Sequence, residues 1–383
     1  MILGIDCSRI RSGGGVAHIR GLLSNVDPVE FGVTEVHLWA HHDLVNTLPV
    51  FPWLKKHSPK AVNSGLIVQV MWQAFKLKLE LKKARCDVLL STFAGNFCDF
   101  SPAIVISHDM LSYEPAQLRR YGWTKNGLRL LLLLFIQNRA FRRSTGVIFL
   151  TQYAAHTIQR STGRLPNYRI IPHGVDESFR LSDRRNPIGE YSLESRIRCI
   201  YISTIAVYKN QDTVVKAIRA LRSRGYDITI DLIGPDDGTG NRSLFDLIRS
   251  VDPKNIFISF LGPCPHHELP EIISNADFFI FASSCENMPV TLIEGMASGI
   301  PIVCSDAGPM PEVLKGGGVY FDTRSPHSLA HALERLIVDK ALRVACTNDA
   351  KTEAANYSWE RTAKETFNYI RDVEQASQAS STP

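Results

Sequence analysis

Two glutamates in the last third of the chain are the strongest candidates for chemistry. Glu286 and Glu294 have seven residues between them. Glu286 follows the apolar run 278–282, which predicts a strand and then a loop, and Glu294 falls on a helix predicted from about 290 to 298. The two carboxylates could hold two parts of one ligand, because the helix N-terminus between them attracts a phosphate. The alternative is an ordinary helix with one acid before it and one on its surface.

Two further features follow predicted strands in the front half. Gly13, Gly14 and Gly15 lie between the first strand and a helix, where glycines let backbone N–H groups approach a phosphate or a sugar. The pattern is not the GxGxxG of dinucleotide-binding folds, and a tight turn is the alternative. His108, followed by Asp109, comes after the apolar run 103–107. It could contact a sugar hydroxyl or act as an acid or base, and a structural histidine is the alternative.

The segment 283–306 resembles the Glu–x7–Glu signature of the retaining glycosyltransferases of family 4, also called group 1. The likeness extends over nearly the whole chain, and the final third is its most distinctive part. The other segments that agree with the family, in order, are the glycine loop 13–15, the HD pair 108–109, 171–176 (IPHGVD for the family's IPNGVD), 208–210 (YKN for EKG), 260–262 with 268–269 (FLG and EL), and 357–359 (YSW).

The resemblance implies a fold and a set of roles. The fold is GT-B, in which two facing Rossmann-like, doubly wound α/β domains are joined by a last helix that crosses back to the first domain. Lys209 would neutralise the donor diphosphate, Glu286 would contact the transferred sugar and Glu294 would hold the ribose hydroxyls. His108 would contact the sugar from the other domain. The remaining donor-binding residues that the resemblance implies are Gly13, Gly14, Gly15, Thr204, Gly234, Leu261, Asn287, Met288, Pro289 and Val290.

The chain departs from the family pattern at four positions. Thr204 stands where an arginine is usual, so one phosphate charge is supplied from elsewhere or is absent. Asn287 and Pro289 stand where glycine is common, and Pro289 has no N–H to donate. His173 replaces the common asparagine.

The resemblance also implies a mechanism that retains the anomeric configuration. In this front-face substitution the leaving phosphate helps to deprotonate the acceptor, while Lys209 and the helix N-terminus near Pro289 stabilise the growing charge. No DxD-type metal motif stands out, and the acidic pair Asp236 and Asp237 is typical of a polar loop before Gly238. We therefore expect no essential metal and no cofactor besides the nucleotide-sugar donor.

Short apolar runs alternate with amphipathic helical stretches, which predicts βαβ units with parallel sheets. The predicted strands are 2–5, 35–39, 88–90, 103–107, 146–150 and 170–172 in the front half, and 199–203, 229–233, 256–261, 278–282 and 302–305 in the back half. Polar residues, proline and glycine collect at 183–195 and predict a boundary there. The predicted domains are an acceptor-binding domain at 1–185 with helix 357–375, a donor-binding domain at 186–356, and a disordered tail at 376–383.

Length and composition favour a two-domain protein of the cytoplasm. The chain has 383 residues, and none of its eight cysteines forms a CxxC pair, which disfavours a zinc site or disulfide framework and favours a reducing compartment. No signal peptide is expected. The most apolar stretch, 130–136, is about a third of a membrane span and predicts a buried helix segment.

The front half is basic, with a net charge of +10 over residues 1–180 against −5 for the remainder. Basic and apolar residues side by side favour contact with an anionic membrane, and a solvated basic face is the alternative. Nucleic acid is disfavoured, because no aromatic stacking platform accompanies the charges. The basic residues are Lys76, Lys78, Lys82, Lys83, Arg85, Arg119, Arg120, Lys125, Arg129, Arg139, Arg142 and Arg143.

The expected function is the transfer of a hexose from a nucleotide-diphosphate sugar to a saccharide or lipid-linked saccharide. The pathway would be cell-surface polysaccharide biosynthesis of the lipopolysaccharide, O-antigen or capsule kind, with mannose the first guess. The alternatives are a sugar-nucleotide epimerase or phosphorylase of similar fold, and a non-catalytic scaffold that binds nucleotide sugars. Only Thr204 favours the scaffold, and the joint presence of Glu286, Glu294, Lys209 and His108 argues against it.

Overall fold

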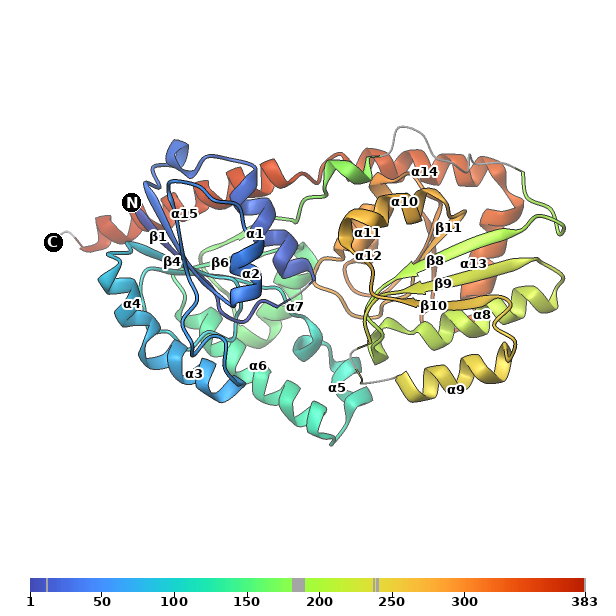
Figure 1. The fold of residues 1–383 in the computed structure, drawn as a ribbon, viewed down its shortest axis with the longest axis horizontal. Coiled ribbons are helices and arrows are strands. Elements are labelled where there is room, and N and C mark those ends of the chain that lie inside the picture. Colours follow the sequence, from blue (N-terminus) through green and yellow to red (C-terminus); the bar gives the residue numbers. More distant parts are fainter. Residues whose placement is uncertain (12, 181–189, 237, 239–240, 382–383) are drawn as a thin grey trace. The chain divides into compact units, whose positions relative to one another are not determined.

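The computed structural model describes residues 1–11, 13–180, 190–236, 238 and 241–381. The chain forms two compact units, which are labelled by element in Figure 1. The N-terminal unit comprises Met1–Gly174 and Ser358–Pro383, and the C-terminal unit comprises Val175–Tyr357.

The N-terminal unit is built on a seven-stranded parallel sheet with the order β3-β2-β1-β4-β5-β6-β7. Its strands are β1 (Ile2–Cys7), β2 (Glu35–Ala40), β3 (Leu54–His57), β4 (Val88–Ser91), β5 (Ala103–Ile106), β6 (Gly146–Phe149) and β7 (Tyr168–Ile170). Its helices are α1 (Gly14–Ser24), η1 (Pro28–Phe31), α2 (His42–Thr47), α3 (Leu66–Phe75), α4 (Leu77–Lys83), η2 (Leu111–Tyr113), α5 (Pro115–Tyr121), α6 (Lys125–Arg143), α7 (Gln152–Thr162) and α15 (Trp359–Ser381). Strands β4 and β6 are buried on both faces, as parallel strands with helices on either side require.

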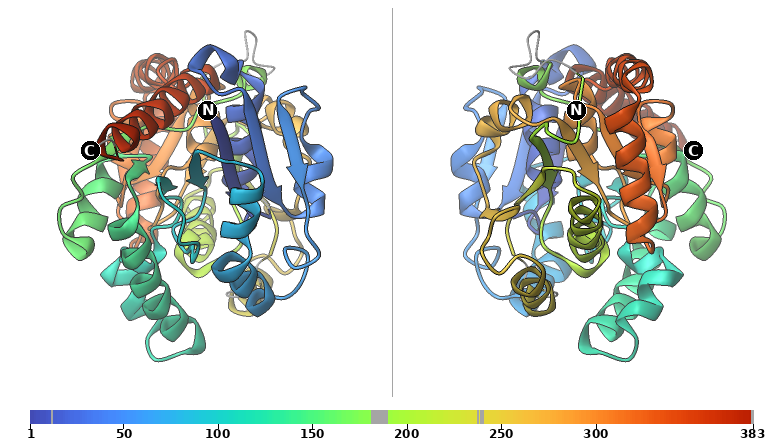
Figure 2. Two further views of the ribbon diagram at one scale, coloured as in Figure 1. Left: turned by 90° about the vertical axis from the view of Figure 1, so that its left-hand side faces the viewer. Right: turned by 90° about the vertical axis from the view of Figure 1, so that its right-hand side faces the viewer.

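Helices pack on this sheet through apolar side chains. Trp72 of α3 and Leu81 of α4 share a core cluster with Trp39 of β2 and Leu89 of β4. Helix α15 packs against α1. The left view of Figure 2 shows α15, in red, returning to the N-terminal unit, so the last helix of the chain completes the first unit.

The C-terminal unit repeats the plan with a six-stranded parallel sheet of order β10-β9-β8-β11-β12-β13. Its strands are β8 (Ile197–Ile202), β9 (Ile228–Ile233), β10 (Ile258–Gly262), β11 (Phe278–Phe281), β12 (Ile302–Ser305) and β13 (Val319–Phe321). Its helices are η3 (Glu177–Phe179), η4 (Val207–Lys209), α8 (Gln211–Ser223), α9 (Asn241–Val251), η5 (His266–Glu268), α10 (Leu269–Ser274), α11 (Val290–Ala297), α12 (Met310–Leu314), α13 (Pro326–Val338) and α14 (Lys340–Ala354). Both sheets reverse their strand order next to their first strand, which is the doubly wound arrangement.

The predicted fold class, two Rossmann-like α/β domains, is confirmed. The prediction missed two edge strands. Strand β3 is short and polar with only Leu54 buried, and β13 has three residues, so neither carries a clear apolar run. The last predicted strand of the front half is shifted, since β7 ends at Ile170 where the strand was expected to begin.

The predicted domain boundary near residues 183–195 is wrong, because the chain enters the C-terminal unit at Val175. Residues 181–189 of that stretch lie outside the described residues. Phe179 is fully buried and its ring lies 5.2 Å from that of His266 in the same unit. Phe179 thus packs in the core of the second unit before the polar stretch begins.

The predicted disordered tail at 376–383 is also corrected, because α15 continues to Ser381. Gln378 donates to Glu374 one turn earlier, and such contacts extend the helix beyond its buried part. Residues 382–383 lie outside the described part of the chain.

The apolar stretch 130–136 lies on α6, but the prediction that it is buried is wrong, because of its residues only Leu130 is buried. The side chains of Leu132 and Phe135 are 60% and 71% exposed. Among the described residues, no helix combines the length and apolar character needed to cross a membrane.

Candidate functional site

One group of candidate residues lies at the carboxyl edge of the C-terminal sheet, at the ends of the adjacent strands β8 and β11. Parallel strands direct the loops that follow them to one edge, and ligands bind where the strand order reverses. Lys209 ends the short helix η4 after β8, and Glu286 lies in the loop after β11. Their ammonium and carboxylate form a half-buried ion pair.

Hydrogen bonds to backbone carbonyls hold these two loops in place. Ser284 donates to the Tyr208 carbonyl from its N–H at 2.8 Å and from its hydroxyl at 3.0 Å. The Asn210 amide donates to the Ala282 carbonyl at 2.8 Å, and the Tyr201 hydroxyl donates to the Lys209 carbonyl at 2.8 Å. The ion pair is therefore placed by the loops and not by flexible side chains alone.

The ion pair also sets the charge of Lys209. Burial by itself would lower the pKa of Lys209, but the charge and hydrogen bond of Glu286 outweigh it and raise the pKa above its ordinary value. The Lys209 ammonium also lies 5.2 Å from the centre of the Tyr208 ring. Lys209 is thus cationic at neutral pH and able to pair with an anion.

Glu294 lies on α11 with a side chain that is 3% exposed. Its Oε1 lies 2.7 Å from Nε2 of His266, which comes from the segment after β10. Its buried Oε2 has no hydrogen-bond partner among the residues that the structure describes. A buried carboxylate oxygen without a donor is costly, and a ligand hydroxyl would satisfy it.

Helix α11 begins at Val290, and Pro289, which suits the first position of a helix, is its N-cap. Asn287, Met288 and Pro289 are buried against the helix start, and Val290 is half-buried. Glu286 and Glu294 thus lie before and within this helix, as the sequence predicted.

Three other residues predicted to bind the donor lie at the neighbouring ends of strands β8, β9 and β10, namely Thr204, Gly234 and Leu261. Gly234 has φ +142°, and a Cβ there would lie 2.2 Å from the Ser203 carbonyl oxygen, so no side chain fits beside Thr204. The Gly234 N–H donates to the Gly262 carbonyl at 2.9 Å, which places the 56% exposed Leu261 at the same edge. Of the acidic pair, Asp236 pairs with Ile205 in an isolated bridge, and Asp237 lies outside the described residues.

A separate group of candidate residues lies at the carboxyl edge of the N-terminal sheet. Gly13 caps α1 with φ +68°, and Gly14 and Gly15 form the first turn of the helix. His108 follows β5 and lies beside His18 of α1 and His173, with ring centres 5.1 and 5.5 Å away. Burial lowers the pKa of His108 to about 4 and the pKa values of His18 and His173 well below their usual range, so all three imidazoles are neutral at pH 7.

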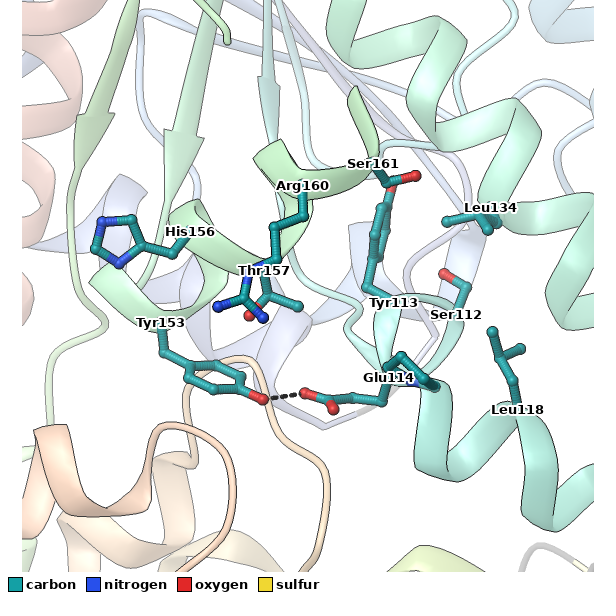
Figure 3. Close-up of a pocket in the computed structure, with 11 residues that line it drawn as sticks. Ser112, Tyr113, Glu114, Leu118, Leu134, Tyr153, His156, Thr157, Arg160 and Ser161 are labelled. Atoms are coloured by element: carbon teal, nitrogen blue, oxygen red, sulfur yellow. Dashed lines mark hydrogen bonds between the residues drawn. The ribbon is translucent and has the colours of Figure 1, made fainter. Parts of the chain in front are cut away.

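A pocket of about 480 Å³ lies in the N-terminal unit, between α7 and the segment that follows His108 (Figure 3). Tyr153 of α7 donates a hydrogen bond to Glu114 across its lower end. Arg160 and Thr157 lie on the α7 side, and Leu118 and Leu134 provide apolar surface opposite. An apolar wall with hydroxyl, carboxylate and guanidinium groups around it suits a sugar ring.

Sequence reasoning missed three histidines that touch predicted site residues. His18 lies one turn into α1 after the glycine loop, and His173 was noted only as a departure from the family pattern. His266 is the first residue of η5 and lies two positions before Glu268, which is part of the family resemblance. Nothing in the sequence spacing of His266 predicts its contact with Glu294. Within the described residues two groups could hold a metal ion: His18, His108 and His173, and the more exposed His41, His42 and Asp43.

The part of the chain that matches a known protein family lies in the C-terminal unit. Residues 188–353 match the family model described as glycosyl transferases group 1. The D-inositol 3-phosphate glycosyltransferase of Corynebacterium jeikeium (strain K411) is 27% identical over 209 residues, 51% of this chain and 49% of that protein. O-antigen chain mannosyltransferase B of Escherichia coli is 28% identical over 183 residues, 47% of each chain. The chain thus spans about half the length of the curated relatives it matches.

Solved structures resemble the chain over its whole length. Sucrose-phosphate synthase from Thermosynechococcus elongatus has a TM-score of 0.79 at 16% identity, covering 98% of this chain and 100% of that one. Anabaena HepE in complex with UDP and glucose has a TM-score of 0.69 at 17% identity, covering 100% and 99%. At these identities the likeness shows the fold, and it confirms the predicted GT-B class.

Proposed function

We propose that this protein is a glycosyltransferase that moves a hexose from a nucleotide-diphosphate sugar to a saccharide or lipid-linked saccharide. The observation that carries the proposal is the cationic Lys209 paired with Glu286 beside the start of α11, with the buried Glu294 on the same helix. These residues lie in the part of the chain that matches the group 1 glycosyl transferase model. The relatives named above act on inositol phosphate and O-antigen chains by their names, which supports a saccharide-type acceptor.

In the proposed reaction the donor diphosphate replaces Glu286 as the partner of Lys209. The N-terminus of α11 adds partial positive charge to stabilise the leaving diphosphate, and Glu294 receives the ribose hydroxyls on its unpartnered Oε2. Glu286, released from the ion pair, accepts a hydrogen bond from a hydroxyl of the transferred sugar. The configuration at the anomeric carbon is retained, and we expect no essential metal.

The acceptor is proposed to bind the N-terminal unit. The pocket of Figure 3 begins four residues after His108, and a chain of hydrogen bonds joins the two places: Gln137 donates to Asp109 at 3.4 Å, and Ser112 donates to Gln137 at 2.7 Å. Its volume of about 480 Å³ is large enough for a saccharide unit of the acceptor. We propose mannose as the first donor sugar to test and cell-surface polysaccharide synthesis as the first pathway.

A screen of nucleotide sugars tests the proposal directly. Thermal unfolding is followed with UDP-, GDP-, ADP- and dTDP-sugars, and one nucleotide class should raise Tm because it binds only the folded protein. The stabilising donor is then incubated with saccharide acceptors and its hydrolysis or transfer measured. Stabilisation without hydrolysis or transfer would support the scaffold alternative, and no stabilisation by any donor would refute the proposal.

We also propose that the enzyme docks on anionic membranes from the cytoplasmic side, through α3. The outward side chains of this helix are apolar and its buried ones include Gln69 and Gln73, the reverse of an ordinary surface helix. Lysines of α4 follow it at once and complement anionic lipid. The exposed apolar side chains are Leu66, Ile67, Val68, Met71 and Phe75, between 46% and 76% exposed.

Vesicle flotation tests this surface. The protein should float with phosphatidylglycerol vesicles and not with phosphatidylcholine vesicles, and added salt should weaken binding. The double variant Ile67→Ser, Phe75→Ser should lose flotation, whereas Val338→Ser, which removes a 67% exposed apolar side chain from the C-terminal unit, should keep it. Equal flotation of both variants would rule out α3 as the docking surface.

A further inference from the structure

Three imidazoles from distant parts of the sequence form one cluster in the N-terminal unit. His18 comes from α1, His108 from the segment after β5 and His173 from the segment after β7. One ring nitrogen of each lies within 4.8 Å of one of each of the others. His18 is 0% and His173 3% exposed, so solvent does not satisfy these rings.

Two buried ring nitrogens of the cluster, His18 Nε2 and His108 Nε2, have no hydrogen-bond partner among the described residues. The His108 imidazole is hydrogen-bonded to the backbone of Thr92, while its buried Nε2 has no partner among the described residues. A backbone partner on one ring nitrogen is what fixes the other as a metal ligand. His18 Nδ1 and His173 Nδ1 lie 2.9 Å apart and share one hydrogen.

We propose that His18, His108 and His173 form a binding site for Zn²⁺ or a similar transition-metal ion. His108 would bind through Nε2 and the other two rings through Nδ1, and an exchangeable water would take the fourth position. Neutral imidazoles are preferred zinc ligands, and three of them with one open position form a known type of zinc coordination.

Metal binding would require one proton to shift within a ring and the distances between ligand nitrogens to change slightly. The ring that donates in the Nδ1–Nδ1 hydrogen bond moves its proton to its own Nε2, so binding needs no net loss of a proton. Zn–N bonds of about 2.0–2.1 Å in a tetrahedron place ligand nitrogens about 3.3 Å apart. The Nδ1 atoms of His18 and His173, now 2.9 Å apart, would move slightly apart. One nitrogen of each of the three rings already lies within 4.8 Å of one nitrogen of the other two, so small ring rotations would reach the tetrahedral spacing.

The consequence for activity rests on the proposed function and on the sugar contact that the family resemblance implies for His108. Metal bound to His108 Nε2 would withhold this nitrogen from the sugar, so the ion would inhibit transfer and EDTA would restore it. His173, which replaces the asparagine common in the resembling family, supplies the third nitrogen. Inhibition by zinc would therefore depend on His173, the one ligand of the three that departs from the family pattern.

Binding is tested with chelator-treated full-length protein and ZnCl₂ by isothermal titration calorimetry, and with Co²⁺ by its visible absorption. The comparison variants are His173→Asn and, as a matched control, His42→Asn in the exposed group His41, His42 and Asp43. His173→Asn should weaken the affinity of the buried site at least about tenfold and abolish zinc inhibition, while His42→Asn leaves both unchanged. Circular dichroism and the Tm of each variant in EDTA check that it is folded.

X-ray absorption of the zinc-loaded wild-type protein provides a second measurement that needs no variant. A first shell with three imidazole nitrogens supports the site. A first shell of carboxylate and water oxygens, or equal zinc affinity in wild type and His173→Asn, would overturn it. Because these measurements detect the ion itself, they remain informative even if no transfer activity is found.

Discussion

The ammonium of Lys209 and the carboxylate of Glu286 form a half-buried ion pair that joins the segments following β8 and β11. The two residues are 77 positions apart in sequence. Because both charges are partly withdrawn from water, each is poised to exchange its partner for a ligand group of opposite charge.

Replacing Lys209 should remove most of the proposed activity. Lys209→Ala takes away the cation that would stabilise the leaving diphosphate, and loss of one such group typically lowers kcat by about 10²–10³-fold. Steady-state transfer or donor hydrolysis measures this. Lys216→Ala, which breaks an exposed ion pair with Asp212 on α8, should leave kcat unchanged. A Lys209→Ala enzyme with wild-type kcat would contradict the proposed role.

Glu294 should contribute mainly to nucleotide binding. Glu294→Gln keeps the shape of the side chain but removes the charge on the unpartnered Oε2, and a hydrogen bond to a charged group contributes about 1.5–3 kcal/mol. The Kd for the stabilising nucleotide should therefore rise by about 10- to 100-fold in calorimetry. The exposed Glu271→Gln on α10 is the control. Unchanged affinity in Glu294→Gln would place the ribose elsewhere.

The N-terminal unit should lose stability on mild acidification. The folded-state pKa values of His18, His108 and His173 are lowered, chiefly by burial, so below about pH 6.5 the unfolded chain binds protons that the folded chain does not. The free energy of unfolding should fall as pH drops from 6.5 towards 4, by up to about 1.4 kcal/mol per pH unit for each histidine.

Denaturant unfolding at pH 5, 6 and 7 in EDTA measures this slope. The slope should be shallower in His173→Asn than in wild type, and unchanged in His267→Asn, whose side chain is 83% exposed. Identical slopes in wild type and His173→Asn would show that the cluster does not carry the pH dependence.

Helix α15 should be held to the N-terminal unit by Trp359. A Cβ on Gly21 of α1 would lie 2.3 Å from the Trp359 ring, so the ring occupies the space that the glycine leaves. Trp359→Ala should cost about 3–5 kcal/mol of unfolding free energy. Trp123, which is 96% exposed, offers a matched control, and Trp123→Ala should change stability by no more than about 0.5 kcal/mol. Similar unfolding curves for the two variants would refute the docking role.

Local sequence patterns determined the type of most elements and the placement of Glu294 on a helix and Glu286 before it. Such relations depend on residues a few positions apart, where apolar runs, proline and glycine act directly on the backbone. The same patterns failed at β3, where three of the four residues of the edge strand Leu54–His57 are polar, and at the tail, where α15 continues through small polar residues.

Only the tertiary structure decided which distant side chains meet. The pairing of Lys209 with Glu286, of His266 with Glu294, and of His18 with His173 depends on strand order and helix packing, which bring together residues 28 to 155 positions apart. No local spacing encodes these contacts, because loop closure and core packing are long-range and collective. The residue types therefore indicated a candidate chemistry, and only the fold showed which of these side chains contact one another.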